Sequence, residues 1–522
     1  MLIKISLQKK FMGGAGKFAS GKMPELAFYS VVIIFFLVLV FAPTLYIAFR
    51  GCPDSGAVCL PSLYLSKEMS DALFNSFSIA FAAVVLDIIF GIPIAWIIAR
   101  YPTKLKVYLN FLVDMPLIMP TAALGFSVAL FWGGEGIGLL SKGFWMILAV
   151  HVAFTYPYIV RTLSAAIEEV DITYEMASRT LGSSPLTAFR TVTLPLFQSG
   201  LLIAALLAFT RSLSETGATM MAVGTGQFFA ATAPAQTLLY KNNGDMASAV
   251  SLSIILIVIS TVLLAGVRYL SNKFGIPIVK VYPSFERSLN SLSLHKNLVA
   301  FAFFIAIILL PSFYLLGFVS YSPGEFGNTM NSIGVSFLIA FVATIANLVF
   351  GVGMALLIGR NRYGLGPIFE FLTDMVMVMP TVALGLSLGM FWNIFNLNEL
   401  LVLAMVHISF SYPYIVKPVA ASIRDLDKNL EDAARVLGAT PFKVFRTITL
   451  PLITPSIVAG VVMAFMRSLS ETGATLAVSK TFKTIPVLIV EFVKASKYGD
   501  AAFASALLLG VSFIAAYLLR RK

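Results

Sequence analysis

The chain has 522 residues, of which 58% are hydrophobic and only 12% are charged. Soluble proteins carry roughly 25% charged residues, so this composition excludes an ordinary soluble domain and predicts an integral membrane protein. The formal net charge of +12 would suit a nucleic-acid partner, but the distribution of the basic residues gives that charge another origin.

Uncharged apolar runs of about 20 residues, each long enough to cross a ~30 Å hydrocarbon core as a helix, recur along the chain. They predict an all-α protein with twelve transmembrane helices in two sets of six, near residues 27–49, 72–99, 109–132, 144–160, 196–214, 248–267, 298–320, 333–359, 369–392, 399–416, 452–468 and 500–519. Helices are expected because hydrocarbon offers no solvent for unpaired backbone groups. The first run is too long for a cleavable signal peptide and lacks a small-residue cleavage site, so it is expected to stay as an anchor.

The Lys and Arg residues follow the loops between these runs. When the N-terminus starts in the cytoplasm, most of the 37 basic residues fall in cytoplasmic segments, as the positive-inside rule requires. The sequence therefore predicts a multi-pass protein of the plasma membrane with both termini in the cytoplasm. The positive charge reflects this topology, and no nucleic-acid partner is expected.

The only two cysteines, Cys52 and Cys59, lie in the first loop, on the outer side of the membrane. Their spacing and the oxidising compartment allow a disulfide, and two unpaired thiols fit equally well. The loop offers too few ligands for a metal site, so no metal is expected there.

The third run of each half carries an acid followed by a proline-containing segment: Asp114 before "MPLIMPT" and Asp374 before "MVMVMPT". Pro120 and Pro380 are expected to kink these helices and to free backbone carbonyls for a pathway. The alternative is a packing kink in which the acid pairs with a neighbouring helix.

Between the fourth and fifth runs, both halves carry the same kind of segment: "DITYEMASRTLGSSPLTAFRTVTLPL" from residue 171 and "DKNLEDAARVLGATPFKVFRTITLPL" from residue 427. Good helix formers end at Gly182 or Gly438, the usual residue past a helix C-terminus. A hydroxyl residue and a proline then predict the start of a second helix. Each half is therefore expected to expose a helix–turn–helix knob in the cytoplasm. Two matching knobs suggest two matching sockets on a dimeric partner, and the alternative is an amphipathic loop that only lies at the interface.

The fifth runs end in the repeated phrase "RSLSETGAT", at residues 211–219 and 467–475. Its Arg and Glu are spaced i,i+4 within the membrane, where charges are costly and mark candidate functional sites. The phrase is either a structural ion pair at a helix end or a symmetric gate, and both interpretations place the two fifth spans together at a pseudo-twofold axis. The candidate gate residues are Arg211, Ser214, Glu215, Thr216, Arg467, Ser470, Glu471 and Thr472.

The knob and gate repeats share an offset of 256 residues, and "MPTAALGFSVALFW" at 119–132 matches "MPTVALGLSLGMFW" at 379–392 with an offset of 260. Because each half has an even number of spans, both halves enter the membrane from the same side, which makes a parallel 6+6 repeat. The predicted organisation is a cytoplasmic N-terminal segment 1–26, a first half 27–270, a cytoplasmic linker 271–297 and a second half 298–522.

The repeated knob resembles the EAA loop of ABC-importer permeases, whose pattern is E-A-A, a Gly four residues after the last Ala, and a downstream I-x-L-P. The second copy fits as Asp432-Ala433-Ala434, Gly438, Ile448 and Leu450-Pro451, and the first as Met176-Ala177-Ser178, Gly182, Val192 and Leu194-Pro195. The first copy has Met in place of the acid, and a Glu stands one residue earlier in both copies. The resemblance implies helices that dock into ATPase subunits through Glu175, Met176, Ala177, Gly182, Glu431, Asp432, Ala433, Ala434 and Gly438.

The same resemblance implies the fused permease of an ATP-driven importer, which needs two copies of a cytoplasmic ABC ATPase and an extracytoplasmic substrate-binding protein. ATP and Mg belong to the ATPase subunits, because this chain carries no Walker motif, so neither a cofactor nor an enzymatic activity is expected here. The rival interpretation is a twelve-helix, ion-coupled secondary transporter, which would not need two duplicated knobs.

Only short sequence motifs bear on the identity of the transported substrate, the cargo. "MPTxALG" and "SETGAT" resemble the sulfate, molybdate and tungstate permeases, whereas the fused arrangement is similar to the ferric-iron, thiamine and aminophosphonate relatives. Arg211 and Arg467 favour an anion, so a small inorganic oxyanion is the expected cargo, with the other three classes as alternatives.

Overall fold

The computed structural model of the chain describes residues 22–50, 66–101, 104–223, 232–271 and 293–520. Every regular element in these ranges is helical, as the composition predicts, and each of the twelve predicted apolar runs lies on helices. Most of the predicted N-terminal segment and of the predicted linker lies outside the described residues.

The first half contains α2 (Lys22–Phe35), the π-helical η1 (Phe36–Phe41), α3 (Ala42–Arg50), α4 (Lys67–Arg100), α5 (Lys104–Ile118), α6 (Thr121–Trp132), α7 (Phe144–Glu169), α8 (Ile172–Thr180), α9 (Pro185–Ala188), the π-helical η2 (Phe189–Thr193), α10 (Leu194–Ser214), α11 (Gly217–Val223), α12 (Ala233–Asn242) and α13 (Met246–Ser271).

The second half contains α15 (Ser293–Phe304), η4 (Ile305–Leu309), α16 (Leu310–Tyr314), η5 (Leu315–Phe318), α17 (Pro323–Gly359), η6 (Arg362–Gly364), α18 (Gly366–Val378), α19 (Thr381–Asn393), α20 (Glu399–Ser411), α21 (Pro413–Asp425), α22 (Lys428–Val436), α23 (Pro441–Val444), the π-helical η7 (Phe445–Thr449), α24 (Leu450–Leu469), α25 (Gly473–Val478), α26 (Ile485–Lys494) and α27 (Tyr498–Arg520).

Within the described ranges, nine helical stretches are long and apolar enough to cross a membrane, and two bent helix pairs are candidates for two more spans. A shorter apolar stretch, Tyr498–Val511, lies at the start of α27. Large apolar side chains stay exposed on the longest helices, among them Phe74 and Phe81 of α4 and Phe341 of α17. Large apolar side chains exposed along a whole helix mark contact with another apolar phase, here the lipid.

The third predicted span of each half is two helices rather than one. α5 and α6 are bent by 100° relative to each other, and α18 and α19 by 106°. Pro120 and Pro380 stand at these breaks, each directly before the first residue of the following helix. Proline has no amide to donate, and the residue before it is disfavoured in the helical conformation. Where the sequence predicts a kink, the structure therefore has a complete break.

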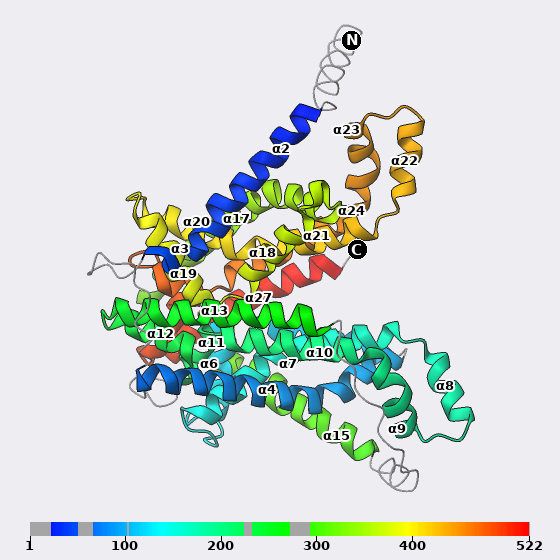
Figure 1. The fold of residues 1–522 in the computed structure, drawn as a ribbon. Helices are drawn as coiled ribbons and strands as arrows, with labels where there is room; N and C mark the ends of the chain where they lie inside the picture. Colours follow the sequence, from blue (N-terminus) through cyan, green and yellow to red (C-terminus); the bar gives the residue numbers. More distant parts are fainter. Residues whose placement is uncertain (1–21, 51–65, 102–103, 224–231, 272–292, 521–522) are drawn as a thin grey trace, which may run out of the picture.

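The first helices of the two halves are exchanged (Figure 1). α2 and α3 pack against α17 and α19 of the second half, whereas α15 and α16 pack against α4 and α6 of the first. The aromatic ring of Phe35 stacks on that of Phe350 with 3.9 Å between the ring centroids, and the ring of Phe303 stacks on that of Phe90 with 4.0 Å between them. The two halves seen in the sequence are therefore interlocked in space.

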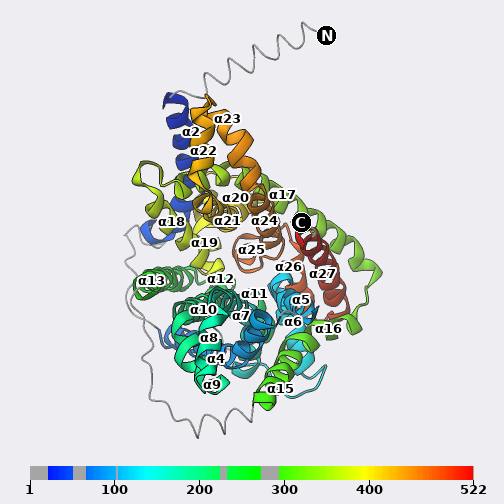
Figure 2. The ribbon, with the colours of Figure 1, turned by 90° about the vertical axis from the view of Figure 1, so that its right-hand side faces the viewer.

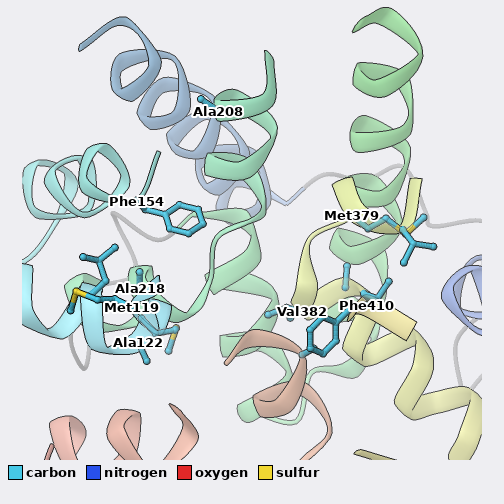
Figure 3. Packing of buried hydrophobic residues seen from close by; sticks show 14 of the residues in the cluster. Met119, Ala122, Phe154, Ala208, Ala218, Met379, Val382 and Phe410 are labelled. Atoms are coloured by element: carbon cyan, nitrogen blue, oxygen red, sulfur yellow. The ribbon is translucent and has the colours of Figure 1, made fainter. Parts of the chain in front are cut away.

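Matching groups of buried side chains lie in the two halves, close to the contact between them (Figure 3). The side chains at equivalent positions of the repeat are Met119, Ala122 and Phe154 in the first half and Met379, Val382 and Phe410 in the second. Close packing of this kind fixes the helices that carry the candidate site.

Two short helix pairs project from the same side of the helical body (Figure 1). They are α8 with α9 and α22 with α23, and Figure 2 looks onto that side, with one pair above the other. Their common side agrees with a parallel internal repeat.

Candidate functional site

The first knob, residues 171–193, follows the end of α7. Asp171 caps α8, since its carboxylate accepts a hydrogen bond of 2.9 Å from the Thr173 amide. This bond lowers the pKa of the Asp171 carboxyl. Gly182 follows α8 with a φ of +91°, where residues with a side chain are strained. The hydroxyl of Ser184 then caps α9 by accepting a 3.1 Å hydrogen bond from the amide three residues later.

The second knob, residues 427–449, repeats this geometry. Asp427 accepts a 2.9 Å hydrogen bond from the Asn429 amide and caps α22. Gly438 has a φ of +81°, and Thr440 caps α23. The predicted order of helix, glycine turn and capped second helix is confirmed in both copies.

Each knob carries a bare apolar tip at the end of its first helix. Leu181 exposes 89% of its surface, and Val436 and Leu437 expose 87% and 88%. A single exposed leucine is common on any protein, but exposed apolar side chains at the same place in two copies indicate a contact surface. The tips are therefore candidates for docking a partner.

The acidic candidates on the knobs face in different directions. Glu175 and Glu431 are buried, each with 8% of its surface exposed, so they do not face a docking partner. Asp432 has 65% of its side chain exposed, and Met176 is exposed at the matching position. The position that matches the EAA acid is thus outward in both copies. Three further candidates lie on the same two helices: Ala177, Ala433 and Ala434.

Arg211 contacts both halves of the chain. Its guanidinium donates to the hydroxyl of Tyr158 in α7 at 3.2 Å and to that of Tyr414 in α21, in the second half, at 2.9 Å. The two tyrosines were not predicted as site residues. The signal available in the sequence was the phrase "YPY", which ends at these two equivalent positions.

The two Arg–Glu pairs of the repeated phrase are not equivalent. Arg467 forms a salt bridge with Glu471 at 2.7 Å, whereas no salt bridge of Arg211 is found among the described residues. Both glutamates cap the short helix that follows, because Glu215 accepts from the Ala218 amide at 2.8 Å and Glu471 repeats this at 2.9 Å. The hydroxyls of Ser214 and Ser470 donate back to the carbonyls of Arg211 and Arg467.

The breaks after the fifth spans lie against each other across the two halves. A methyl group placed on Gly217 would lie 2.6 Å from the Cβ of Thr472, and one on Gly473 would lie 3.1 Å from the Cβ of Thr216. Only glycine lets the threonine side chain of the other half approach its backbone this closely. The two breaks therefore meet, as a pseudo-twofold axis requires, and their action as a gate stays a prediction.

Two histidines brace these breaks from within. His151 and His407 are buried, and each hydrogen-bonds through both ring nitrogens to hydroxyls on either side of the break, at 2.7 to 3.1 Å. Because both nitrogens are satisfied by hydroxyls, the histidines act as structural bridges in the core.

The aspartates at the equivalent positions before Pro120 and Pro380 are both in ion pairs. Asp114 is held by Arg161 of α7, and Asp374 is held by Lys417 and by Arg268, each at 2.5 Å. Arg268 belongs to α13 of the first half, so this pair also joins the halves. Acids that pair with neighbouring helices were one of the two alternatives for these positions.

Cysteines in place of Thr216 and Thr472 are expected to join the halves covalently. The test uses a chain with Cys52 and Cys59 replaced by Ser and a protease site inserted in the linker. After treatment with a short thiol-reactive crosslinker and protease, the chain should keep its full length on a denaturing, non-reducing gel. A control pair of Thr216→Cys with Leu338→Cys should separate into two fragments. Complete separation of both pairs would contradict contact at the axis.

Two predictions of the sequence concern cysteines and metals. Cys52 and Cys59 lie outside the described residues, so their pairing stays a prediction. Within the described part of the chain, no three His, Cys, Asp or Glu side chains are grouped as metal ligands.

Two stretches of the chain, residues 91–276 and 347–521, match the family described as "Binding-protein-dependent transport system inner membrane component". Over 503 residues the chain is 25% identical to the Fe(3+)-transport system permease protein FbpB 2 of Haemophilus influenzae, covering 92% of this chain and 95% of the relative. It is 32% identical over 209 residues to the sulfate transport system permease protein CysT of Salmonella typhimurium, covering 38% of this chain and 76% of the relative. It is 33% identical over 207 residues to the putrescine transport system permease protein PotI of Escherichia coli, covering 37% of this chain and 73% of the relative.

Proposed function

The chain belongs to the family of binding-protein-dependent transport system inner membrane components, and on this premise we propose that it forms the pathway of an ATP-driven importer and receives the motion of its ATPase through the two knobs. It is a multi-pass inner membrane component and not itself an ATPase. Transport in this family depends on a binding protein, which supplies the cargo.

In the proposed arrangement the knobs and both chain ends lie in the cytoplasm. One copy of the ATPase subunit docks on each knob, and the binding protein docks at the opposite side of the membrane. The excess of basic residues in the predicted cytoplasmic segments supports this orientation. The common side of the two knobs, seen in Figure 2, lets two copies of one ATPase contact both at once.

The observation that carries this proposal is the pair of bare apolar tips, formed by Leu181 in one knob and by Val436 and Leu437 in the other. Full burial of an exposed leucine or valine side chain in a partner's pocket contributes about 1.5–3 kcal/mol, so three such side chains can support a stable contact. The knobs carry shape rather than reactive groups, which suits a mechanical contact.

The knobs are direct extensions of the fifth spans. α9 continues through the π-helical η2 into α10, and α23 continues through η7 into α24. When the ATPase pair closes and draws the knobs together, the fifth spans act as levers. Their far ends are the breaks near residues 215–217 and 471–473, where the halves meet, so closure of the ATPase moves the contact that blocks the pathway.

Mass spectrometry of the gently solubilised native complex tests the proposal. An ATPase with a Walker motif, at two copies per chain, is the expected result. If no ATPase is found after crosslinking, and uptake collapses with the proton or sodium gradient, the chain is instead a secondary transporter.

We propose a small inorganic oxyanion of the sulfate or molybdate type as cargo. The relatives are named for iron, sulfate and putrescine, which differ in charge, so relationship alone does not choose among them. The local support is Arg211, a cation at the contact between the halves that is held by two tyrosine hydroxyls rather than by a carboxylate. Ferric iron is the second candidate, because the relative that covers nearly the whole chain is named for it.

Replacing Arg211 by Gln is expected to lower oxyanion uptake by about tenfold or more, since a hydrogen bond to a charged group contributes ~1.5–3 kcal/mol. Uptake of labelled sulfate and molybdate into proteoliposomes with the native ATPase and binding protein measures the effect. Lys106→Gln, which removes an exposed cation paired with Glu168, is the control and should leave uptake unchanged. Unchanged uptake in Arg211→Gln, or uptake of iron but of neither anion, would contradict the cargo proposal.

A further inference from the structure

Three side chains tie α22, the first helix of the second knob, to the adjoining ends of the transmembrane helices α17 and α24. Glu431 of α22 forms a salt bridge with Arg360, the residue after α17. The same carboxylate oxygen accepts a hydrogen bond of 2.5 Å from the hydroxyl of Thr449, directly before α24. Only 10% of the Glu431 side chain and 13% of the Arg360 side chain are exposed. Charge-assisted bonds are strong at sites shielded from water, so Arg360, Glu431 and Thr449 form what we call the clasp.

The first half has the same three residue types at equivalent positions, Arg100, Glu175 and Thr193. No hydrogen bond or ion pair joins these three in the part of the chain that the structure describes. Arg100 instead donates to the backbone carbonyl of Val170 at 2.9 Å. Among the described residues, the second carboxylate oxygen of Glu175, the hydroxyl of Thr193 and two guanidinium nitrogens of Arg100 are buried without a hydrogen-bond partner. Buried polar atoms normally have partners. The first half therefore contains the three residues of a clasp without the bonds between them, an arrangement we call unfastened.

The first knob also has room to shift. A cleft of about 790 Å³ lies beside it, lined by residues of α7, of α10 and of the start of the knob, among them Val170, Asp171 and Tyr174. Val170 lines this cleft, and its carbonyl also accepts the hydrogen bond from Arg100. The cleft therefore lies next to the unfastened residues of the first half.

Resting on the proposed function, we propose that Arg360, Glu431 and Thr449 are positioning residues that fix the second knob, and that the first knob is held loosely because its equivalent residues are unfastened. The two knobs then transmit closure of the ATPase with different stiffness. The second knob moves as one body with α24, whereas the first shifts relative to α10 before α10 follows. One molecule thus contains both arrangements of the same three residues.

Hydrogen exchange of the intact complex in lipid nanodiscs, with its ATPase bound, tests this inference. Arg360→Gln is expected to speed amide exchange in residues 428–436 about tenfold, the factor that corresponds to ~1.4 kcal/mol. Arg360→Lys, which keeps the charge, should restore most of the protection. The matched control Arg100→Gln should leave exchange in residues 172–180 within about twofold of the wild type, because it breaks no clasp.

Two isosteric changes repeat the test where an arginine variant fails to fold. Thr449→Val should speed exchange in the second knob, and Thr193→Val should not do so in the first. Exchange in the peptides of α24 serves as the local reference, since general unfolding would raise it as well. The inference is overturned if Arg100→Gln and Thr193→Val speed exchange as strongly as Arg360→Gln and Thr449→Val do. It is also overturned if all four variants exchange at the wild-type rate. Loss of the ATPase from the wild-type complex would instead overturn the proposed function, so the two failures are distinguishable.

Discussion

Replacing Gly438 by Val is expected to reduce ATPase binding and transport by about tenfold or more while the membrane helices stay folded. The φ of Gly438 is +81°, and holding a residue with a side chain in that region costs ~1–3 kcal/mol, most for a β-branched one. At this turn the amides of Gly438 and Ala439 close the end of α22 by bonding to carbonyls of Arg435 and Ala434, at 2.9 and 3.0 Å. Valine would open the turn and displace the apolar tip beside it.

Co-purification of the ATPase and ATP hydrolysis by the reconstituted complex measure this effect, and thermal unfolding of the detergent-solubilised chain verifies the fold. A methyl group on Gly438 would have no heavy atom within 4 Å, so any loss comes from backbone strain and not from a clash. Gly438→Asn is the matched control, because Asn tolerates a positive φ, and it should keep most of the activity. Full ATPase binding by Gly438→Val, and by Gly182→Val in the first knob, would exclude the docking role of the knobs.

The second large effect is structural: Gly125→Ala is expected to destabilise the folded chain by about 3 kcal/mol or more. The added methyl group would lie 2.4 Å from the carbonyl oxygen and 2.5 Å from the Cα of Ala218. Both are backbone atoms of α11, so the clash cannot be relieved by a side-chain rotation. Gly385 meets Ala474 in the same way in the second half.

A fall in the thermal unfolding midpoint of the detergent-solubilised protein is the measurement. Gly334→Ala in α17 is the control, because a methyl group there has no neighbour within 4 Å and alanine favours a helix. An unfolding midpoint for Gly125→Ala equal to that of the control would contradict the close approach of α6 and α11.

The parts of the fold that depend on neighbouring residues could be predicted from the sequence. The knob turns need a glycine at positive φ and a hydroxyl before a proline, and Gly182, Gly438, Ser184 and Thr440 supply these within a few residues of one another. The helical class and the span positions depend on where long apolar runs occur along the chain, so they too could be predicted.

The internal repeat also predicted one distant contact, that of the two breaks after the fifth spans, but the individual side-chain contacts between distant residues were beyond such reasoning. Nothing local to Arg211 indicates that it reaches Tyr414 across the halves, 203 residues later. Likewise, among the described residues, the identical phrase "RSLSETGAT" gives a salt bridge only in its second copy, because the guanidinium of Arg211 in the first copy bonds to two tyrosine hydroxyls. The break at Pro380 was expected as a kink, since proline fixes where a helix is interrupted but packing decides how far the chain turns.

The exchange of the first helices bears on how the chain is made. α2 and α3 leave the ribosome before α17 and α19, the helices they pack against, have been synthesised. The first half likewise lacks α15 until translation has passed residue 304. During this interval the ring of Phe35 is without Phe350, and that of Phe90 is without Phe303. Neither half can therefore finish folding as a unit while the other is missing, and carrying both on one polypeptide delivers the two in equal amounts to the same place in the membrane.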